Sequence, residues 1–199
     1  MSYRKDLPRE FYRRDPKIVA ANLLGKILVR RISDQLLEGI IVETEAYYGV
    51  EDPASRARDG MKRYNMLMWG EVGLAFIYNV HNNWMFNVVT HEPKGVGAVL
   101  IRAIEPLNGI ETMMANRKTR SIKNLTNGPG RLTRALGINK ELNCVDLTNS
   151  ENPIFISEGK PIDEREICRS HRVGVKRDLD VELRFYIRGN PFVSKTRVI

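Results

Sequence analysis

The chain has 199 residues, of which 42% are hydrophobic and 28% charged, a balance that suits a globular protein with a buried core. Lys and Arg number 32 against 24 Asp and Glu, and the net charge of +8 favours a polyanionic partner: nucleic acid, an acidic membrane surface or a phosphorylated substrate. No apolar run approaches the ~20 residues of a membrane span. Two cysteines and three scattered histidines fit neither a disulfide framework nor a zinc site.

Residues 2–14 form a basic lead-in that either touches a polyanion or is mobile. This charged start lacks the apolar stretch of a signal peptide, so we expect an intracellular protein, cytoplasmic or, in a eukaryote, nuclear. Asp15-Pro16 predicts a helix start, because Asp caps free amides and Pro suits the first helical position. The helix should end near Leu24. In chain order, the pattern then predicts strands at 26–32 and 36–48 and a polar irregular segment at 49–64.

Two apolar runs, 74–80 and 84–90, flank His81-Asn82-Asn83 and predict a β-hairpin, because Asn tolerates left-handed backbone. Such an aromatic-rich hairpin is usually core, but in a basic protein its polar tip could also wedge into a nucleic-acid groove. The remaining elements expected in chain order are a strand at 97–104, a helix at 106–117, a basic loop at 117–123, a turn at 127–130, a helix at 131–136, a strand at 153–157, a short helix near 164–169, and strands at 172–175 and 183–187.

Strands therefore outnumber helices and mostly neighbour one another in sequence, which favours an α+β fold with an antiparallel or mixed sheet and flanking helices. No internal repeat or flexible linker divides the chain. We expect a single domain over residues 1–199, with 1–14 as its lead-in.

The strand at 36–48 carries an unusual acidic face. Alternation places Ile40, Val42, Thr44 and Ala46 on one side, and Ile41, Glu43, Glu45 and Tyr47 on the other. Two carboxylates on an otherwise apolar strand are costly unless they are solvated, paired or used. The pattern alone favours a solvent-facing edge with a salt bridge. The alternatives are a general base beside a stacking aromatic, or half of a carboxylate metal site.

Two further features could recognise an anion. Arg102 interrupts an apolar strand, where pairing with Glu43 or Glu105 is favoured over a phosphate. The Gly128-Pro129-Gly130 turn opens a helix, and its free amides either hold a phosphate or only make the turn. The basic clusters at 117–123 and 169–177 are typical of solvated surface.

Read in order, these segments resemble the alkyladenine (3-methyladenine) DNA glycosylase family of the vertebrate and Bacillus type. The resemblance runs from about Asp15 to Ser194. Six ordered blocks carry it: Ile41-Val42-Glu43-Thr44-Glu45-Ala46-Tyr47, Glu51-Asp52-Pro53-Ala54, Asn87-Val88-Val89, Leu100-Ile101-Arg102-Ala103-Ile104-Glu105-Pro106, Asn127-Gly128-Pro129-Gly130-Arg131-Leu132 and Arg184-Phe185-Tyr186-Ile187-Arg188-Gly189.

The resemblance implies a monofunctional DNA glycosylase that flips an alkylated or deaminated purine out of duplex DNA and hydrolyses its N-glycosidic bond, leaving an abasic site. It implies no cofactor, no metal and no membrane, a monomer, double-stranded DNA with a damaged purine as the partner, and an α+β domain with a protruding hairpin that inserts into DNA.

The resemblance also implies roles for individual residues. Glu45 matches the catalytic base that activates a water, and Arg102 an arginine near that water and the phosphate. Tyr47 and Tyr78 match aromatics that stack on the flipped base, where electron-rich rings attract a cationic purine. Asn87 matches a residue that excludes normal guanine by clashing with its 2-amino group.

Two positions depart from the family pattern. Arg56 replaces a histidine that lines the base pocket; unless it turns outward to a phosphate, it would repel a cationic base and shift preference toward neutral lesions such as hypoxanthine. His81-Asn82-Asn83 replaces Tyr-Gly-Met in a hairpin one residue shorter, which makes His81 the expected wedge. We assign further DNA contacts to Asn82 at the tip and to Gly128 and Arg131.

Two other functions compete with this interpretation. One is a metal-dependent nuclease that uses Glu43, Glu45 and Asp52. The other is a non-catalytic protein that binds damaged DNA and has lost turnover through the changes at Arg56 and His81.

Overall fold

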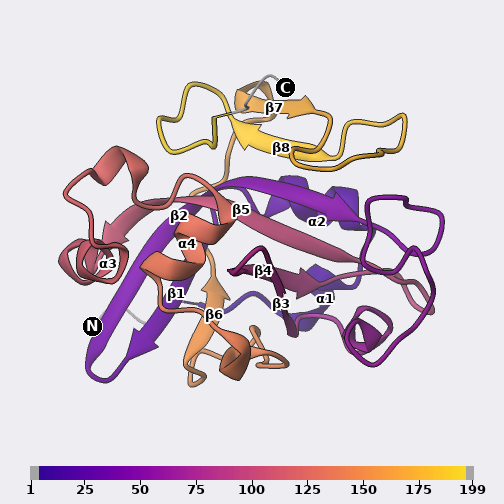
Figure 1. Ribbon diagram of the computed structural model, residues 1–199, viewed down its shortest axis with the longest axis horizontal. Helices are drawn as coiled ribbons and strands as arrows, with labels where there is room; N and C mark the ends of the chain where they lie inside the picture. The colour runs from indigo at the N-terminus through magenta and orange to yellow at the C-terminus, as the bar shows by residue number, and fades with distance from the viewer. Residues whose placement is uncertain (1–4, 196–199) are drawn as a thin grey trace.

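The computed structural model describes residues 5–195, which form one curled antiparallel sheet with helices packed against it (Figure 1). The strands are β1 Ile27–Ile32, β2 Gln35–Tyr47, β3 Ala75–Val80, β4 Asn83–Val89, β5 Ala98–Asn108, β6 Ile154–Ser157, β7 Ile167–Ser170 and β8 Arg184–Ile187. Their order is β3-β4-β5-β2-β1-β6, and β8 pairs with both β2 and β7. The predicted α+β class is confirmed.

The helices are short; two precede β1 and two follow β5 in the chain. They are α1 Arg9–Tyr12, α2 Pro16–Asn22, α3 Ile110–Arg117 and α4 Pro129–Ala135. The predicted cap of α2 is confirmed, because the Asp15 carboxylate accepts the Lys17 amide at 2.7 Å. Within residues 5–195, no helix is long and apolar enough to cross a membrane.

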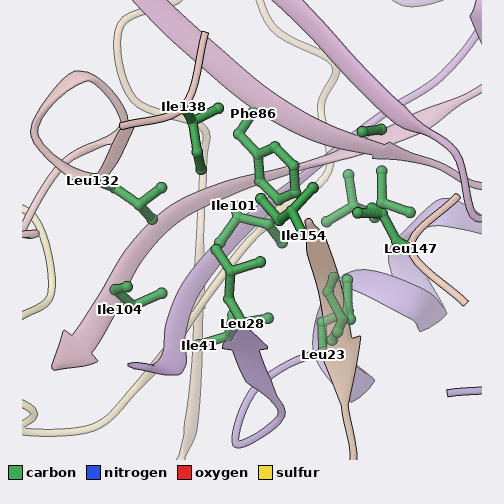
Figure 2. Packing of buried hydrophobic residues seen from close by; sticks show 14 of the residues in the cluster. Leu23, Leu28, Ile41, Phe86, Ile101, Ile104, Leu132, Ile138, Leu147 and Ile154 are labelled. Atoms are coloured by element: carbon green, nitrogen blue, oxygen red, sulfur yellow. The ribbon is translucent and has the colours of Figure 1, made fainter. Parts of the chain in front are cut away.

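The main core lies where α2 and α4 pack on the sheet. Figure 2 shows Leu23, directly after α2, and Leu132 of α4 around side chains from the central strands, including Leu28 and Ile101. All four are fully buried, and burying an aliphatic side chain of this size contributes roughly 1.5–3 kcal/mol. This core packs helix α4 and the end of α2 onto the central strands.

Part of the basic lead-in belongs to this core. Leu7 and Tyr12 are fully buried, and Arg9 donates to the Val72 carbonyl and the Asp146 carboxylate, both at 2.5 Å. Residues 5–14 are therefore packed against the domain. Residues 1–4 of the lead-in lie outside the described residues.

Three sequence expectations were wrong. β5 stays extended to Asn108, paired with Glu38 of β2, and α3 begins only after Gly109, whose φ of 71° makes the turn. The helix expected at 164–169 is a 3-10 turn, Glu164–Glu166, followed by β7. Residues 172–175 are not a strand, because the backbone amides of Arg172 and Val173 donate to the carboxylates of Asp178 and Glu45 instead of to a neighbouring strand.

β2 changes partners along its length. It pairs with β1 up to Ile40 and with β8 from Glu43 to Glu45, while β5 lies along its other edge. The β2–β5 pairing skips Val42 and Arg102, and such bulges re-aim side chains. Ile41, expected on the acidic face, is instead fully buried in the main core (Figure 2). Strict alternation failed because of the bulge.

Candidate active site

Glu43 is a fully buried carboxylate at the centre of an ion cluster. Its Oε1 accepts from Arg102 Nε at 2.9 Å, Arg184 Nε at 2.8 Å and the Ser194 hydroxyl at 2.7 Å. Its Oε2 accepts the Ser194 amide at 2.6 Å. Burial alone would raise the pKa of Glu43, but Arg102 and Arg184 outweigh burial and hold the pKa below its usual value. Glu43 is therefore an ionised anchor for two arginines.

Glu45 is also fully buried and is held by three donors. Its Oε1 accepts the Val173 amide at 2.7 Å, and its Oε2 accepts from the Tyr47 hydroxyl at 2.7 Å and Arg102 Nη1 at 3.2 Å. Burial and the adjacent Glu45 carboxylate raise the pKa of Tyr47 well above its ordinary value, so the phenol keeps its proton. This proton is thus available to hold the carboxylate in place.

Arg102 bridges the two carboxylates. The predicted pairing with Glu43 is confirmed and extends to Glu45, whereas Glu105 accepts from Asn190 at 2.7 Å. Burial would lower the pKa of Arg102, but the carboxylates of Glu45 and Glu43 outweigh this effect and raise it. The pattern alone favours a solvent-facing edge for Glu43 and Glu45, and this prediction is wrong because both carboxylates are fully buried.

A second ion cluster lies beside Tyr47. Arg172 donates to Asp52 at 2.6 and 2.7 Å, to Asp178 at 2.5 and 2.9 Å and to the Ala46 carbonyl at 2.9 Å. Its guanidinium carbon stands 4.5 Å from the Tyr47 ring centroid. Burial would raise the pKa of Asp52, but hydrogen bonds from Arg172 and from backbone amides lower it. Arg172 was expected in a solvated basic cluster and is instead buried.

These clusters also bear on the carboxylates proposed for a metal site. Glu43 and Glu45 both bind Arg102, and Asp52 binds Arg172. Their negative charge is therefore used to hold arginines.

A pocket of about 810 Å³ opens next to the first cluster, within the roughly 300–1,000 Å³ typical of small-molecule sites. Its walls include Tyr47, Tyr78, Arg102 and Val173, of which all but Tyr78 contact Glu45 directly. Glu45 thus lies immediately behind the wall of a pocket that has an aromatic ring from β2 and another from β3. This arrangement brings together the residues predicted for base binding and catalysis.

The end of the pocket next to β3 and β4 is tightly packed. Tyr78 and Phe76 share one strand face as expected, with ring centroids 5.1 Å apart, and burial raises the pKa of Tyr78. Asn87 is 2% exposed, and its amide donates to the Phe76 carbonyl at 2.9 Å and the Met85 carbonyl at 3.2 Å. Its nitrogen therefore fixes the hairpin, and the residue lines a residual cavity of about 10 Å³ beside Tyr47 and Tyr78.

The predicted hairpin is confirmed as β3–β4, but its turn is shorter than expected. Val80 pairs with Asn83, so His81 and Asn82 alone form the turn and Asn83 belongs to β4. Both turn residues are exposed and have positive φ, 47° and 60°, as a type I′ turn requires. The His81 and Asn82 side chains are thus at the outer end of the hairpin.

The start of α4 packs against this hairpin. Gly128 precedes the helix with a φ of 145°, and Pro129 lines the pocket. Arg131 is exposed and donates to Asn127 at 2.6 Å. Gly130 faces Asn83 so closely that an added Cβ would stand 2.6 Å from Asn83 Oδ1. Gly128 and Arg131 therefore lie beside the hairpin rather than within the ion clusters.

Gly130→Ala should disturb the hairpin through this contact. Asn83 Nδ2 donates to the His81 carbonyl at 2.8 Å, so pushing Asn83 away loosens the turn. We expect a stability loss of about 1–3 kcal/mol, typical of overpacking, measured by thermal unfolding. Asn83→Gly in the same chain should restore part of that loss. Equal stability of the single and double variants would contradict the role of this contact.

Sequence reasoning missed Arg172, Val173, Arg184 and Ser194 as parts of the site. Three buried acids at positions 43, 45 and 52 require cationic partners, which is a signal that arginines must be nearby. The sequence offers many arginines, however, and only the fold selects Arg102, Arg172 and Arg184.

Comparisons with known proteins identify the family of the chain. A profile of the family described as methylpurine-DNA glycosylase matches residues 10–191. A protein of Aeropyrum pernix named "Putative 3-methyladenine DNA glycosylase" is 41% identical over 193 residues, covering 96% of this chain and 94% of the relative. Proteins with the same name from Carboxydothermus hydrogenoformans and Prosthecochloris aestuarii are 42% and 43% identical, covering 95% and 94% of this chain and 98% and 90% of the relatives. The chain therefore belongs to the methylpurine-DNA glycosylase family.

Proposed function

We propose that this chain is a base-excision-repair DNA glycosylase that hydrolyses the N-glycosidic bond of a damaged purine flipped out of duplex DNA. The observation that carries the proposal is Glu45, a buried carboxylate directly behind the wall of an aromatic pocket. Flipping is needed because the target bond is hidden inside the base stack. Family membership and the net charge of +8 support DNA as the partner.

In this mechanism Glu45 accepts a proton from the water that attacks C1′ of the sugar. Its negative charge also stabilises the positive charge that the sugar develops as the bond to the base breaks. Arg102 donates to Glu45 and lines the pocket, so it positions the carboxylate and can contact the water or the phosphate. Tyr47 and Tyr78 hold the purine by stacking.

The hairpin and α4 supply the DNA contacts. His81 at the exposed turn fills the space left by the flipped base, and Asn82 contacts the duplex next to it. Gly128 and Arg131 lie at the start of α4, where the open space beside Gly128 lets a phosphate approach and the exposed guanidinium of Arg131 can bind it. Asn87, next to Tyr78, sets the shape of the pocket against normal guanine.

The test is release of free base from duplex oligonucleotides that each carry one hypoxanthine, ethenoadenine or methylated purine, incubated in parallel with EDTA and with Mg²⁺. We expect release of the damaged base and strand cleavage only after alkali treatment. Direct strand breaks that require a divalent metal would indicate a nuclease. Tight binding to damaged duplex with no base released would indicate a non-catalytic binding protein. Either result would reject the proposal.

A further inference from the structure

The arginines around the pocket differ in how their charge is balanced. Arg102 is paired with Glu43 and Glu45, and Arg172 with two aspartates. Arg56, which also lines the pocket, forms no ion pair with any carboxylate among residues 5–195. Lys176 and Arg177 line the same pocket and, among residues 5–195, also form no ion pair, but of these three cations only Arg56 stands over an aromatic ring of the pocket.

The loop that carries Arg56 is firmly held. The carbonyl of Arg56 accepts from the buried Asn65 amide at 2.7 Å, and that amide also binds the Gly60 carbonyl at 3.0 Å. On one side of Arg56, the buried Ser55 hydroxyl donates to the Tyr48 carbonyl at 2.5 Å. On the other side, Ala57 is fully buried in a small core cluster. The backbone thus fixes where the side chain starts.

The side chain of Arg56 lies over one of the two base-stacking rings. Its guanidinium carbon is 4.5 Å from the centroid of Tyr78, and it lines the same cavity as Tyr47 and Asn87. Of the two orientations considered from the sequence, the structure has the one that faces the pocket. A guanidinium at this distance already interacts with the electron-rich face of the ring, and it repels any second cation brought close to it.

We propose that Arg56 determines which class of lesion the pocket accepts, by favouring uncharged purines with a carbonyl acceptor, such as a deaminated adenine, over purines made cationic by alkylation at N3 or N7. This inference rests on the proposed glycosylase function and deepens it. A flipped cationic base would place two positive charges on one aromatic ring. A 6-oxo group can accept a hydrogen bond from the guanidinium in hypoxanthine and in 7-methylguanine alike, so these two lesions differ in the charge that Arg56 meets. Arg56 acts on binding and selection, and Glu45 remains the group that activates water.

The test compares hypoxanthine and 7-methylguanine release by the native protein and by Arg56→Gln, as the ratio of the two kcat/KM values. Gln keeps a polar side chain and removes the charge. We expect the ratio to move toward 7-methylguanine by about tenfold, the scale of one unscreened charge near a pocket. Arg58→Gln is the matched control: Arg58 belongs to the same loop and also lines the pocket, but its charge is paired with Asp59 at 3.4 Å and it lies over neither tyrosine, so its ratio should stay within about twofold of native.

A second measurement separates this inference from the proposed function. The affinities of the same proteins for duplexes carrying hypoxanthine or a 2′-fluoro-stabilised 7-methylguanine should shift in the same direction. If no protein releases either base, the glycosylase proposal fails, and the affinity ratio alone decides the role of Arg56. Unchanged ratios in Arg56→Gln, or equal shifts in Arg56→Gln and Arg58→Gln, would overturn the inference.

Discussion

Replacing Glu45 with glutamine is expected to slow base release about 100- to 10,000-fold, the usual contribution of a general base, while binding to damaged duplex is retained. Glutamine has nearly the same shape, and its carbonyl oxygen can still accept the Val173 amide that lies 2.7 Å from Glu45. It cannot accept a proton from water, and it brings no negative charge toward the developing cation on the sugar. The loss should therefore fall on kcat rather than on affinity.

Two further variants make the Glu45 result specific. Glu105→Gln changes a carboxylate on the same sheet that binds Asn190 instead of the ion cluster, and its release rate should stay within about twofold of native. Tyr47→Phe keeps the stacking ring but removes the hydroxyl that donates to Glu45, so we expect an intermediate loss. Single-turnover base release and thermal unfolding are measured for all three. Full activity in a folded Glu45→Gln protein would show that another group activates the water.

The parts of the fold that local chemistry determines could be predicted from the sequence. The Asp15 cap, the β3–β4 hairpin and the two long central strands follow from capping, turn residues and runs of apolar side chains. The predicted secondary structure was wrong where tertiary contacts determine the conformation of a segment. Pro106 is typical of a helix start, yet its segment stays extended because β5 pairs with β2 as far as Asn108.

The sequence predicts which residues of β2, β3 and β5 form the site, but not the hydrogen bonds and ion pairs that join them to the loops. Charged side chains within apolar strands carry a desolvation penalty unless they are paired, and this singles out Glu43, Glu45 and Arg102 in the sequence. The β2–β5 pairing skips Val42 and Arg102, and this bulge moves Ile41 to the core. No pattern in a single sequence predicts such a bulge. Arg172 and Ser194 come from loops 120 and 151 residues further along the chain than the acids they bind, Asp52 and Glu43, at positions that only the folded sheet brings close.

Glu43→Gln is expected to destabilise the folded protein by about 3 kcal/mol at pH 7, within the range for breaking a buried ion pair. Glu43 is fully buried, and its carboxylate is shared by Arg102 and Arg184, which would be left with less negative charge around them. The free energy of unfolding is measured with a chemical denaturant at several pH values. Glu71→Gln is the control, because Glu71 forms an exposed pair with Arg13 that should contribute under about 1 kcal/mol.

The pH dependence of this difference tests its electrostatic origin. The pKa of Glu43 is lowered by folding, so its contribution is complete above the unfolded pKa of about 4.3 and is lost as the pH falls through the lower folded value. The stability gap between native protein and Glu43→Gln should therefore narrow below about pH 4. Other carboxylates with lowered pKa values, such as Asp52, destabilise both proteins equally in acid and cancel from the gap. A gap that is the same at pH 3 and pH 7 would mean that Glu43 stabilises the fold by packing alone, and that Arg102 reaches Glu45 without the charge of its neighbour.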